Sequence, residues 1–267
     1  ADVLTGNVGS DTITGGADSD IAVFAGNQAD YTFASSTNGL TITVTHVSSG
    51  DADTVSEVET FRFDDGDIGV SHDGTNLVLT GTDTITDDIK VVGTVPVTVK
   101  GSGDADVLTG GEGADTIEGG AGADVIDGGT GADTIDGGAD DDTLKGNLGS
   151  DIITGGTGSD IAEFAGKQSD YTFASSTDGL TITVTHVSSG DADTVSEVET
   201  LRFDDGDIGV SHDGNTMVLS GTDAITDDIK IVGTVPVTVE GAGDADTITG
   251  GDGADTISGD AGSDAIR

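Results

Sequence analysis

The sequence predicts an all-β protein in which short parallel strands wind into a coil. First, an Asp returns at every ninth position across residues 101–163, and a glycine-rich hexad ends at each one. Second, segments such as Leu40–His46 alternate apolar and polar residues with the period of a strand. Third, no stretch shows the periodicity of an amphipathic helix. Together these patterns predict a β-solenoid that is interrupted by other β-rich segments.

The nine-residue unit consists of a six-residue loop and a three-residue strand, as in Gly119–Asp124 followed by Val125–Asp127. Its glycines permit positive φ angles, so the loop can curl with its carbonyls inward. Two units make one coil turn, which stacks residues 18 apart at a spacing of about 4.7–4.9 Å. The Asp residues then form two columns, one of Asp106, Asp124, Asp142 and Asp160 and the other of Asp115, Asp133 and Asp151.

Stacked carboxylates repel one another, by roughly 3 kcal/mol per neighbouring pair at about 5 Å and an effective dielectric constant near 20. The core is thin, with one dependable inward apolar residue in each unit, such as Ile117 or Ile126. A divalent cation between turns would reverse the repulsion. Carboxylate and carbonyl oxygens in an adaptable cage suit Ca²⁺ better than Mg²⁺. We therefore expect the chain to fold when calcium binds.

The unit Gly110-Gly-Glu-Gly-Ala-Asp-Thr-Ile-Glu118 is similar to the calcium-binding repeat of RTX (repeats-in-toxin) proteins. Residues 119–127, 128–136 and 155–163 match it as closely. The resemblance implies a parallel β-roll, several bound Ca²⁺ ions, secretion through a type I channel and folding in extracellular calcium. It also implies that the ligands are loop carbonyls and the sixth-position carboxylates: Asp2, Asp11, Asp20, Asp106, Asp115, Asp124, Asp133, Asp142, Asp151, Asp160, Asp246, Asp255 and Asp264.

Several loops depart from this pattern. Asp or Asn replaces a glycine at Asn7, Asp18, Asp104, Asp140, Asn147, Asp244 and Asp260. Both residue types tolerate a left-handed backbone, so we expect these loops to remain competent. Ala22 and Ala162 replace the large inward residue, which predicts a coil that narrows or opens there.

A second repeat of 140 residues encloses the first. Phe24–Lys100 and Phe164–Glu240 differ at 11 of 77 positions. The predicted organisation is a partial β-roll block (1–23), a β-rich insert (24–100), a long β-roll block (101–163), a second insert (164–240) and a closing partial block (241–267).

The inserts are predicted to be strands. Leu40, Ile42, Val44 and His46 share one face of a strand that forms a hairpin with Tyr31–Phe33 through Asn38-Gly39. Further strands are expected where Phe61 and Phe63 flank Arg62 and where Val95, Val97 and Val99 alternate, with Pro96 at a sheet edge.

Composition excludes several classes of protein. The chain carries 51 acidic and 8 basic residues, a net charge of -43, so nucleic acid and anionic membranes would be repelled. Without Cys it cannot use disulfides, and it has no apolar run long enough to cross a bilayer. It shows no signal peptide and starts in mid-repeat. We therefore interpret it as a segment of a longer extracellular protein.

Other candidate sites are weaker. Ser71-His72-Asp73 and its copy Ser211-His212-Asp213 are consecutive strand residues, which cannot align as a catalytic triad. His46 and His186 lack partners at zinc-ligand spacing. Two alternatives stay open for the group Glu57, Glu59, Asp64, Asp65 and Asp67: an additional calcium site, or a solvated acidic turn, which we favour. Arg62 and Arg202 are expected to pair with these carboxylates.

The sequence therefore favours a non-enzymatic, calcium-binding structural segment of a secreted surface-layer protein, adhesin stalk or matrix fibre. Near-identical modules support this, because a stalk benefits from equal units. The expected partners are neighbouring modules or further copies of the chain, with cell-surface or matrix glycans left open. The alternative is the non-catalytic tail of a secreted protease, lipase or polysaccharide-modifying enzyme.

Overall fold

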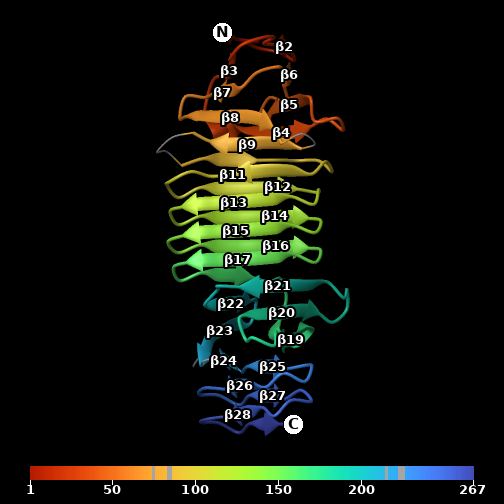
Figure 1. Ribbon diagram of the computed structural model, residues 1–267, viewed down its shortest axis with the longest axis vertical. Helices are drawn as coiled ribbons and strands as arrows, with labels where there is room; N and C mark the ends of the chain where they lie inside the picture. Colours follow the sequence, from red (N-terminus) through yellow and green to blue (C-terminus); the bar gives the residue numbers. More distant parts are fainter. Residues whose placement is uncertain (74–75, 83–85, 214–215, 222–225) are drawn as a thin grey trace.

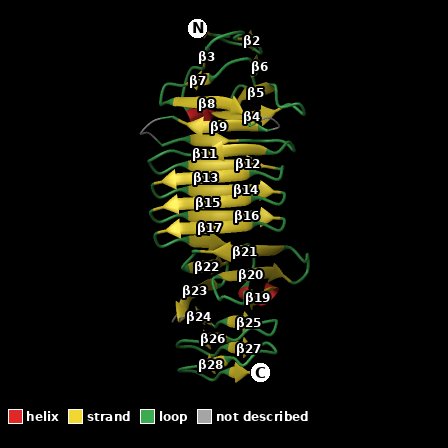
Figure 2. Cartoon of the chain, viewed as in Figure 1, coloured by secondary structure: helices red, strands yellow, loops and turns green. Residues whose placement is uncertain are grey.

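The computed structural model describes residues 1–73, 76–82, 86–213, 216–221 and 226–267. Strands stack along one long axis, and the two termini lie at opposite ends of the stack (Figure 1). The described residues form 29 strands and two short 3-10 turns, at Gln28–Asp30 and Gln168–Asp170 (Figure 2). The all-β prediction is confirmed. No helix in the described part of the chain is long and apolar enough to cross a membrane.

The roll block, residues 101–163, is a regular two-sided coil. Its strands are β12 (Val107–Gly111), β13 (Thr116–Ala121), β14 (Val125–Thr130), β15 (Thr134–Ala139), β16 (Thr143–Leu148), β17 (Ile152–Thr157) and β18 (Ile161–Glu163). Alternate strands pair in parallel, with Thr116 opposite Thr134 and Thr134 opposite Ile152. Partners are 18 residues apart, which confirms the predicted parallel β-roll.

Apolar side chains from the two sides meet along the axis of the roll block. Each unit contributes one residue that is at most 1% exposed: Leu108, Ile117, Ile126, Ile135, Leu144, Ile153 and Ala162. The core is therefore one side chain deep on each side. A core this narrow buries little apolar area per ordered residue, so packing alone offers the block little stability.

The first insert, residues 24–100, continues the same stack. Its strands are β4 (Tyr31–Ser35), β5 (Thr41–His46), β6 (Ala52–Ser56), β7 (Thr60–Arg62), β8 (Asp67–His72), β9 (Leu77–Gly81), β10 (Asp88–Lys90) and β11 (Val97–Lys100). Two antiparallel meanders, β6-β5-β4 and β7-β8-β9, lie on opposite sides of the coil. Parallel pairing resumes at β9 with β11 and at β10 with β12.

The remaining strands repeat this plan. The N-terminal block holds β1 (Val3–Leu4), β2 (Thr12–Thr14) and β3 (Ile21–Val23). The second insert, residues 164–240, holds β19 (Tyr171–Ser175), β20 (Thr181–His186), β21 (Ala192–Ser196), β22 (Thr200–Phe203), β23 (Gly206–Asp213), β24 (Thr216–Ser220), β25 (Asp228–Lys230) and β26 (Val237–Glu240). The C-terminal block holds β27 (Thr247–Thr249), β28 (Thr256–Ser258) and β29 (Ala265–Ile266).

Equivalent parts of the two inserts lie on opposite sides of the coil. The meander β4–β6 belongs to the side that continues through β10, β12, β14 and β16, which it joins by the bridge from Phe33 to Val91. Its counterpart β19–β21 pairs with β17 on the other side. The reason is an odd count: β2 and its equivalent β17 are fifteen strands apart, or seven and a half turns.

Two details of the predicted insert strands need correction. The hairpin is confirmed, because Tyr31 pairs with His46 and Phe33 with Val44 in antiparallel register. Leu40, however, is 62% exposed, because it precedes the strand and belongs to the turn. Pro96 was expected at a sheet edge, but it directly precedes β11, which lies between β9 and β13. A proline at this point removes no ladder hydrogen bond, since the ladder begins at Val97.

Ala22 marks the place where the coil meets the aromatic core of the insert. The residue is fully buried and lies opposite Phe61 in the parallel pair of β3 and β7. Phe61 packs edge-on against Phe24, with ring centroids 5.6 Å apart, and Phe24 stacks on Phe63 at 5.5 Å. The small alanine thus leaves room for aromatic rings on the next strand.

Candidate metal sites

The sixth-position Asp residues of the roll block form two buried columns. Each is at most 1% exposed and stands immediately before a strand. In one column the backbone N–H of Asp106 donates to Asp124 Oδ1 and that of Asp124 donates to Asp142 Oδ1, both at 2.8 Å. Asp115 and Asp133 are linked in the same way in the other column. One oxygen of each carboxylate therefore fixes the stacking of the turns.

The second carboxylate oxygen has a different environment. It is buried without a hydrogen-bond partner in Asp11, Asp20, Asp115, Asp124, Asp133, Asp142, Asp151, Asp160 and Asp246. A buried, unpartnered carboxylate oxygen is costly, so a row of them indicates a missing positive ligand. Asp106 differs, because its Oδ2 accepts the N–H of Ser102 at 2.7 Å.

Glycine leaves the space beside these oxygens open. A methyl group added to Gly110 would lie 2.7 Å from Asp115 Oδ2 and 2.6 Å from the carbonyl oxygen of Gly128 in the next turn. The same addition to Gly119 would collide with Asp124 Oδ2 and the Gly137 carbonyl oxygen. A carboxylate oxygen and a carbonyl oxygen of the adjacent turn thus converge on a cradle that only glycine keeps free.

The electrostatics of the columns favour a cation. Burial raises the pKa of Asp124 to about 7, and it raises the pKa of Asp115, Asp133 and Asp142 to about 6. Backbone N–H donors oppose this effect, while neighbouring carboxylates in the column add to it. The ionised columns are therefore unfavourable in this fold unless positive charge is supplied.

The donor set fits calcium. Within the described residues, no three His, Cys, Asp or Glu side chains gather where they could hold a metal ion. A site here would instead combine one carboxylate with backbone carbonyls, such as Asp115 Oδ2 with the Gly128 carbonyl. An all-oxygen, adaptable cage of this kind suits Ca²⁺, which would supply the charge that the columns lack.

The predicted ligands outside the roll block are less uniformly enclosed. Asp20 and Asp246 are buried, Asp11, Asp255 and Asp264 are half-buried, and Asp2 is exposed. The stacking bond is nevertheless present, since Asp2 N–H donates to Asp20 Oδ1 at 2.6 Å and Asp246 N–H to Asp264 Oδ1 at 3.2 Å. The ligand role of all thirteen Asp residues stays a prediction.

The insert contributes acidic residues to the columns that the sequence analysis missed. Asp11 N–H donates to Asp53 Oδ1 at 2.8 Å, and Asp20 N–H donates to Glu59 Oε2 at 2.8 Å. Asp87 N–H donates to Asp106 Oδ1 at 2.7 Å. The second insert repeats these contacts through Asp193, Glu199 and Asp227. The signal was an acidic residue two places before a buried apolar one, as in Asp53-Thr-Val55.

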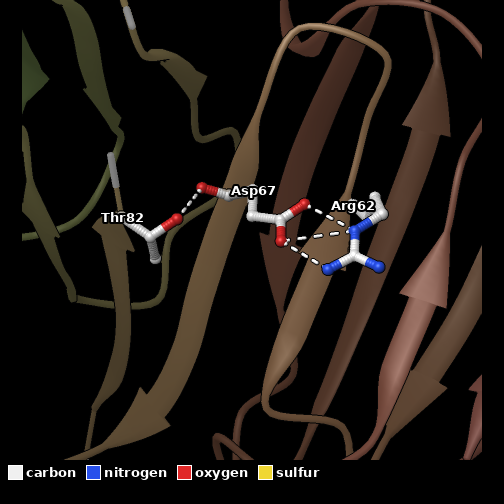
Figure 3. A network of polar contacts seen from close by, with 3 residues as sticks. All are labelled: Arg62, Asp67 and Thr82. Atoms are coloured by element: carbon white, nitrogen blue, oxygen red, sulfur yellow. Dashed lines mark hydrogen bonds and ion pairs between the residues drawn. The ribbon is translucent and has the colours of Figure 1, made fainter. Parts of the chain in front are cut away.

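The acidic group 57–67 does not gather into one site. Asp64 and Asp65 accept backbone N–H groups from Gly26 and Gln28. Asp67 binds Arg62, with Oδ1 2.9 Å from Nε and Oδ2 2.8 Å from Nη2, and its carbonyl accepts the Thr82 hydroxyl (Figure 3). This confirms the predicted partner of Arg62.

Arg202 is shared between two carboxylates. It lies 3.3 Å from Asp207, which was expected, and 3.5 Å from Glu163, which was not. Glu163 also binds Lys145 at 2.9 Å.

The histidines have structural partners. His46 packs edge-on against Tyr31 with ring centroids 5.0 Å apart, and its Nδ1 contacts the Ser49 hydroxyl at 3.0 Å. His72 Nε2 donates to the Gly39 carbonyl, which ties β8 to the hairpin turn. Asp73 Oδ1 accepts the backbone N–H of Asn76 at 2.8 Å.

Most departing loops take the left-handed backbone that was expected. The φ angle is positive at Asn7, Asp18, Asp140, Asn147 and Asp260, between 53° and 83°. Asp104 and Asp244 are not among the positive-φ residues. The pair of strands on either side of Asp104 has a 19-residue register, Asp88 opposite Val107, so that loop holds one residue more than the others.

Comparison with protein families matches four stretches of the chain, residues 1–31, 100–135, 127–162 and 238–266, to the RTX calcium-binding nonapeptide repeat. These stretches coincide with the blocks that carry the Asp columns and leave most of both inserts outside the match. A search of curated proteins found no significant match to the chain. RTX repeats bind calcium, occur in secreted proteins and form a non-catalytic structural module. The chain therefore belongs to the RTX calcium-binding nonapeptide repeat family.

Proposed function

We propose that this chain is a calcium-dependent structural segment of an extracellular stalk, fibre or surface layer, which folds where calcium is plentiful. The observation that carries the proposal is the row of buried carboxylate oxygens without partners, from Asp115 to Asp160. Adjacent carboxylates repel by roughly 3 kcal/mol at about 5 Å, and the narrow core offers little to offset that. Several bound calcium ions make the stack favourable.

The continuity of the sheets supports a structural role. The roll block passes directly into both inserts, through the pairs β11–β13 and β17–β21, without a flexible linker. Two near-identical modules thus form one stiff rod (Figure 1). The partners proposed for it are neighbouring modules and further copies of the chain, with glycans of a cell surface or matrix as external ligands.

The family supports an export route as well. We propose that the chain leaves the cell unfolded through a type I channel, because the calcium-free chain cannot fold in a cytosol where free calcium is scarce. Its charge of -43 keeps such an unfolded chain soluble.

Calcium titration of the purified chain tests the proposal. Far-UV circular dichroism should show a cooperative coil-to-β transition that EDTA reverses, and Mg²⁺ at the same concentration should not replace calcium. The two tyrosines, Tyr31 and Tyr171, both lie in inserts, so their fluorescence reports the inserts separately. A full β signal in EDTA would contradict the proposal.

A further inference from the structure

One Asp column of the roll block ends at the second insert. After Asp160, the residue 18 positions on falls in the hairpin of β19 and β20. The strand that stacks next is β21, and its Ser196 lies opposite Thr154, 42 residues away. The insert therefore supplies the next rung of the column with residues that lie outside the RTX match.

The cradle of Asp160 is completed by the insert. In successive turns, an added methyl on Gly119 would meet the Gly137 carbonyl oxygen, and one on Gly137 would lie 2.7 Å from the Gly155 carbonyl oxygen. At Gly155 the corresponding oxygen is the backbone carbonyl of Glu197. Asp160 Oδ2 faces the same space, 2.8 Å from the added methyl, and is buried without a partner.

Glu197 holds an unusual backbone conformation. Its φ is 52°, and the equivalent Glu57 in the first module has a φ of 53°. A positive φ is uncommon for a residue other than glycine and carries strain that the surroundings must maintain. The carbonyl so aimed accepts the N–H of Gly156 at 3.1 Å, as the Glu57 carbonyl accepts that of Gly16 at 3.2 Å. Both glutamate side chains are exposed.

The acid two residues later also joins the column. Glu199 Oε2 accepts Asp160 N–H at 2.9 Å, the bond that Asp160 Oδ1 makes with Asp142 N–H one turn earlier, also at 2.9 Å. The first module matches it, with Glu59 accepting Asp20 N–H. The insert thus reproduces both components of a roll rung, the carboxylate acceptor and the converging carbonyl.

We propose that each module holds a calcium site shared between roll and insert: Asp20 Oδ2 with the Glu57 carbonyl in the first module, and Asp160 Oδ2 with the Glu197 carbonyl in the second. The inference rests on the proposed calcium-binding function and extends it to residues outside the nonapeptides. The ligand contributed by Glu57 and Glu197 is the backbone oxygen, and the carboxylate takes no part. These sites fasten each insert to the block that precedes it.

Three double variants separate the backbone from the side chain. Glu57→Val with Glu197→Val disfavours the positive φ and turns the carbonyl away, so this chain should bind two calcium ions fewer than the wild type. Glu57→Gln with Glu197→Gln keeps the backbone and removes the charge, and it should bind the wild-type number. Glu57→Gly with Glu197→Gly permits the same φ and should also bind the wild-type number. Native mass spectrometry of the calcium-saturated chains counts the ions.

The outcomes are distinct. Unchanged stoichiometry in the valine chain, or a loss of two ions in the glutamine chain, overturns this inference while leaving the proposed function intact. A wild-type chain that binds no calcium overturns both. If the valine chain stays unfolded at saturating calcium, crystals of the loaded wild type decide. An anomalous peak between Asp160 Oδ2 and the Glu197 carbonyl supports the site, and its absence beside peaks elsewhere in the column refutes it.

Discussion

The roll block and the inserts are stacked in the same sheets but are stabilised by different means. The roll block contains no aromatic residue, and its core is one aliphatic side chain per unit. All nine Phe and Tyr residues lie in the inserts, where they pack around Phe24, Phe33 and Phe63. The roll block instead buries a carboxylate in every unit. One region thus depends on a cation and the other on packing.

This difference shows how one solenoid can be built from two kinds of turn. Parallel turns of nine-residue units are short and leave carbonyls free for a metal. Antiparallel meanders bury larger side chains and need no metal within them. Where they meet, Ala22 and Ala162 fit the aromatic cluster, while Glu59 and Glu199 extend the carboxylate columns.

The largest effect is expected from the packing of the insert. Phe173→Ala removes a fully buried ring next to Phe203 and should lower the free energy of unfolding of the calcium-loaded chain by about 3–5 kcal/mol. The number of bound calcium ions at saturation should not change. Denaturant unfolding and ion counting measure the two quantities.

Leu180→Ala is the matched control, because Leu180 lies in the same insert and is 56% exposed. It should change the free energy of unfolding by no more than about 0.5 kcal/mol. Loss of calcium ions in the Phe173→Ala chain would show that packing and metal binding are not separable in this way.

The second effect concerns the metal. Asp133→Asn keeps the size of the side chain but removes the charge of a buried ligand, so the calcium midpoint of the transition should rise about tenfold or more. A tenfold change corresponds to about 1.4 kcal/mol. Calcium titration followed by circular dichroism measures the midpoint.

Asp136→Asn provides the comparison within the same nonapeptide, because Asp136 is exposed on the outer face. Its midpoint should stay within about twofold of the wild type, since screened surface charges contribute little. Equal shifts in the two variants would mean that overall charge, and not the column, controls folding.

The third effect is a pH dependence of opposite sign with and without calcium. Burial raises the pKa of Asp124 to about 7 and of Asp133 to about 6, above the unfolded value of 3.8. Protonation therefore favours the calcium-free fold, and the stability it gives is lost as the pH rises through 6 to 7. Calcium-free chain should resist urea better at pH 5 than at pH 8.

In the presence of calcium the sign reverses, because protons compete with the metal for the same carboxylates. The calcium midpoint should increase as the pH falls from 8 to 5. Calcium-free stability that rises with pH would contradict the electrostatic account of the columns.

The smallest effect is expected at the outer surface. Lys145→Ala removes a half-exposed ion pair with Glu163, whose atoms are 2.9 Å apart. The free energy of unfolding should fall by about 0–1 kcal/mol, and 1 M salt should abolish the difference. A loss above about 2 kcal/mol that survives in salt would give this surface pair the weight of a buried contact.

The sequence was sufficient for the regular part of the fold. The strict nine-residue period predicted the two columns, Asp106 to Asp160 and Asp115 to Asp151, because a constant period converts directly into a stacking register. It could not predict that Asp53 and Glu59 join them. Their partners lie 42 and 39 residues away, and those separations depend on how hairpins fold out of the coil and return.

The unpredicted parts share a physical cause. Leu40 looked like a strand residue by alternation, but the hairpin turn claims it, and the register of a turn is set by its backbone geometry. Glu197 has no unusual feature as a letter in the sequence. Its role follows from a backbone angle that only the folded chain defines.

The fifteen strands that separate β2 from β17 give the molecule the symmetry of a twofold screw. Each module advances along the rod by about 36 Å, from seven and a half turns of about 4.8 Å, and rotates by half a revolution. Any surface feature of an insert is therefore presented alternately on the two flanks of the rod. A flat surface touches only one of the two inserts in the same way, whereas two surfaces facing each other meet identical flanks of the same rod.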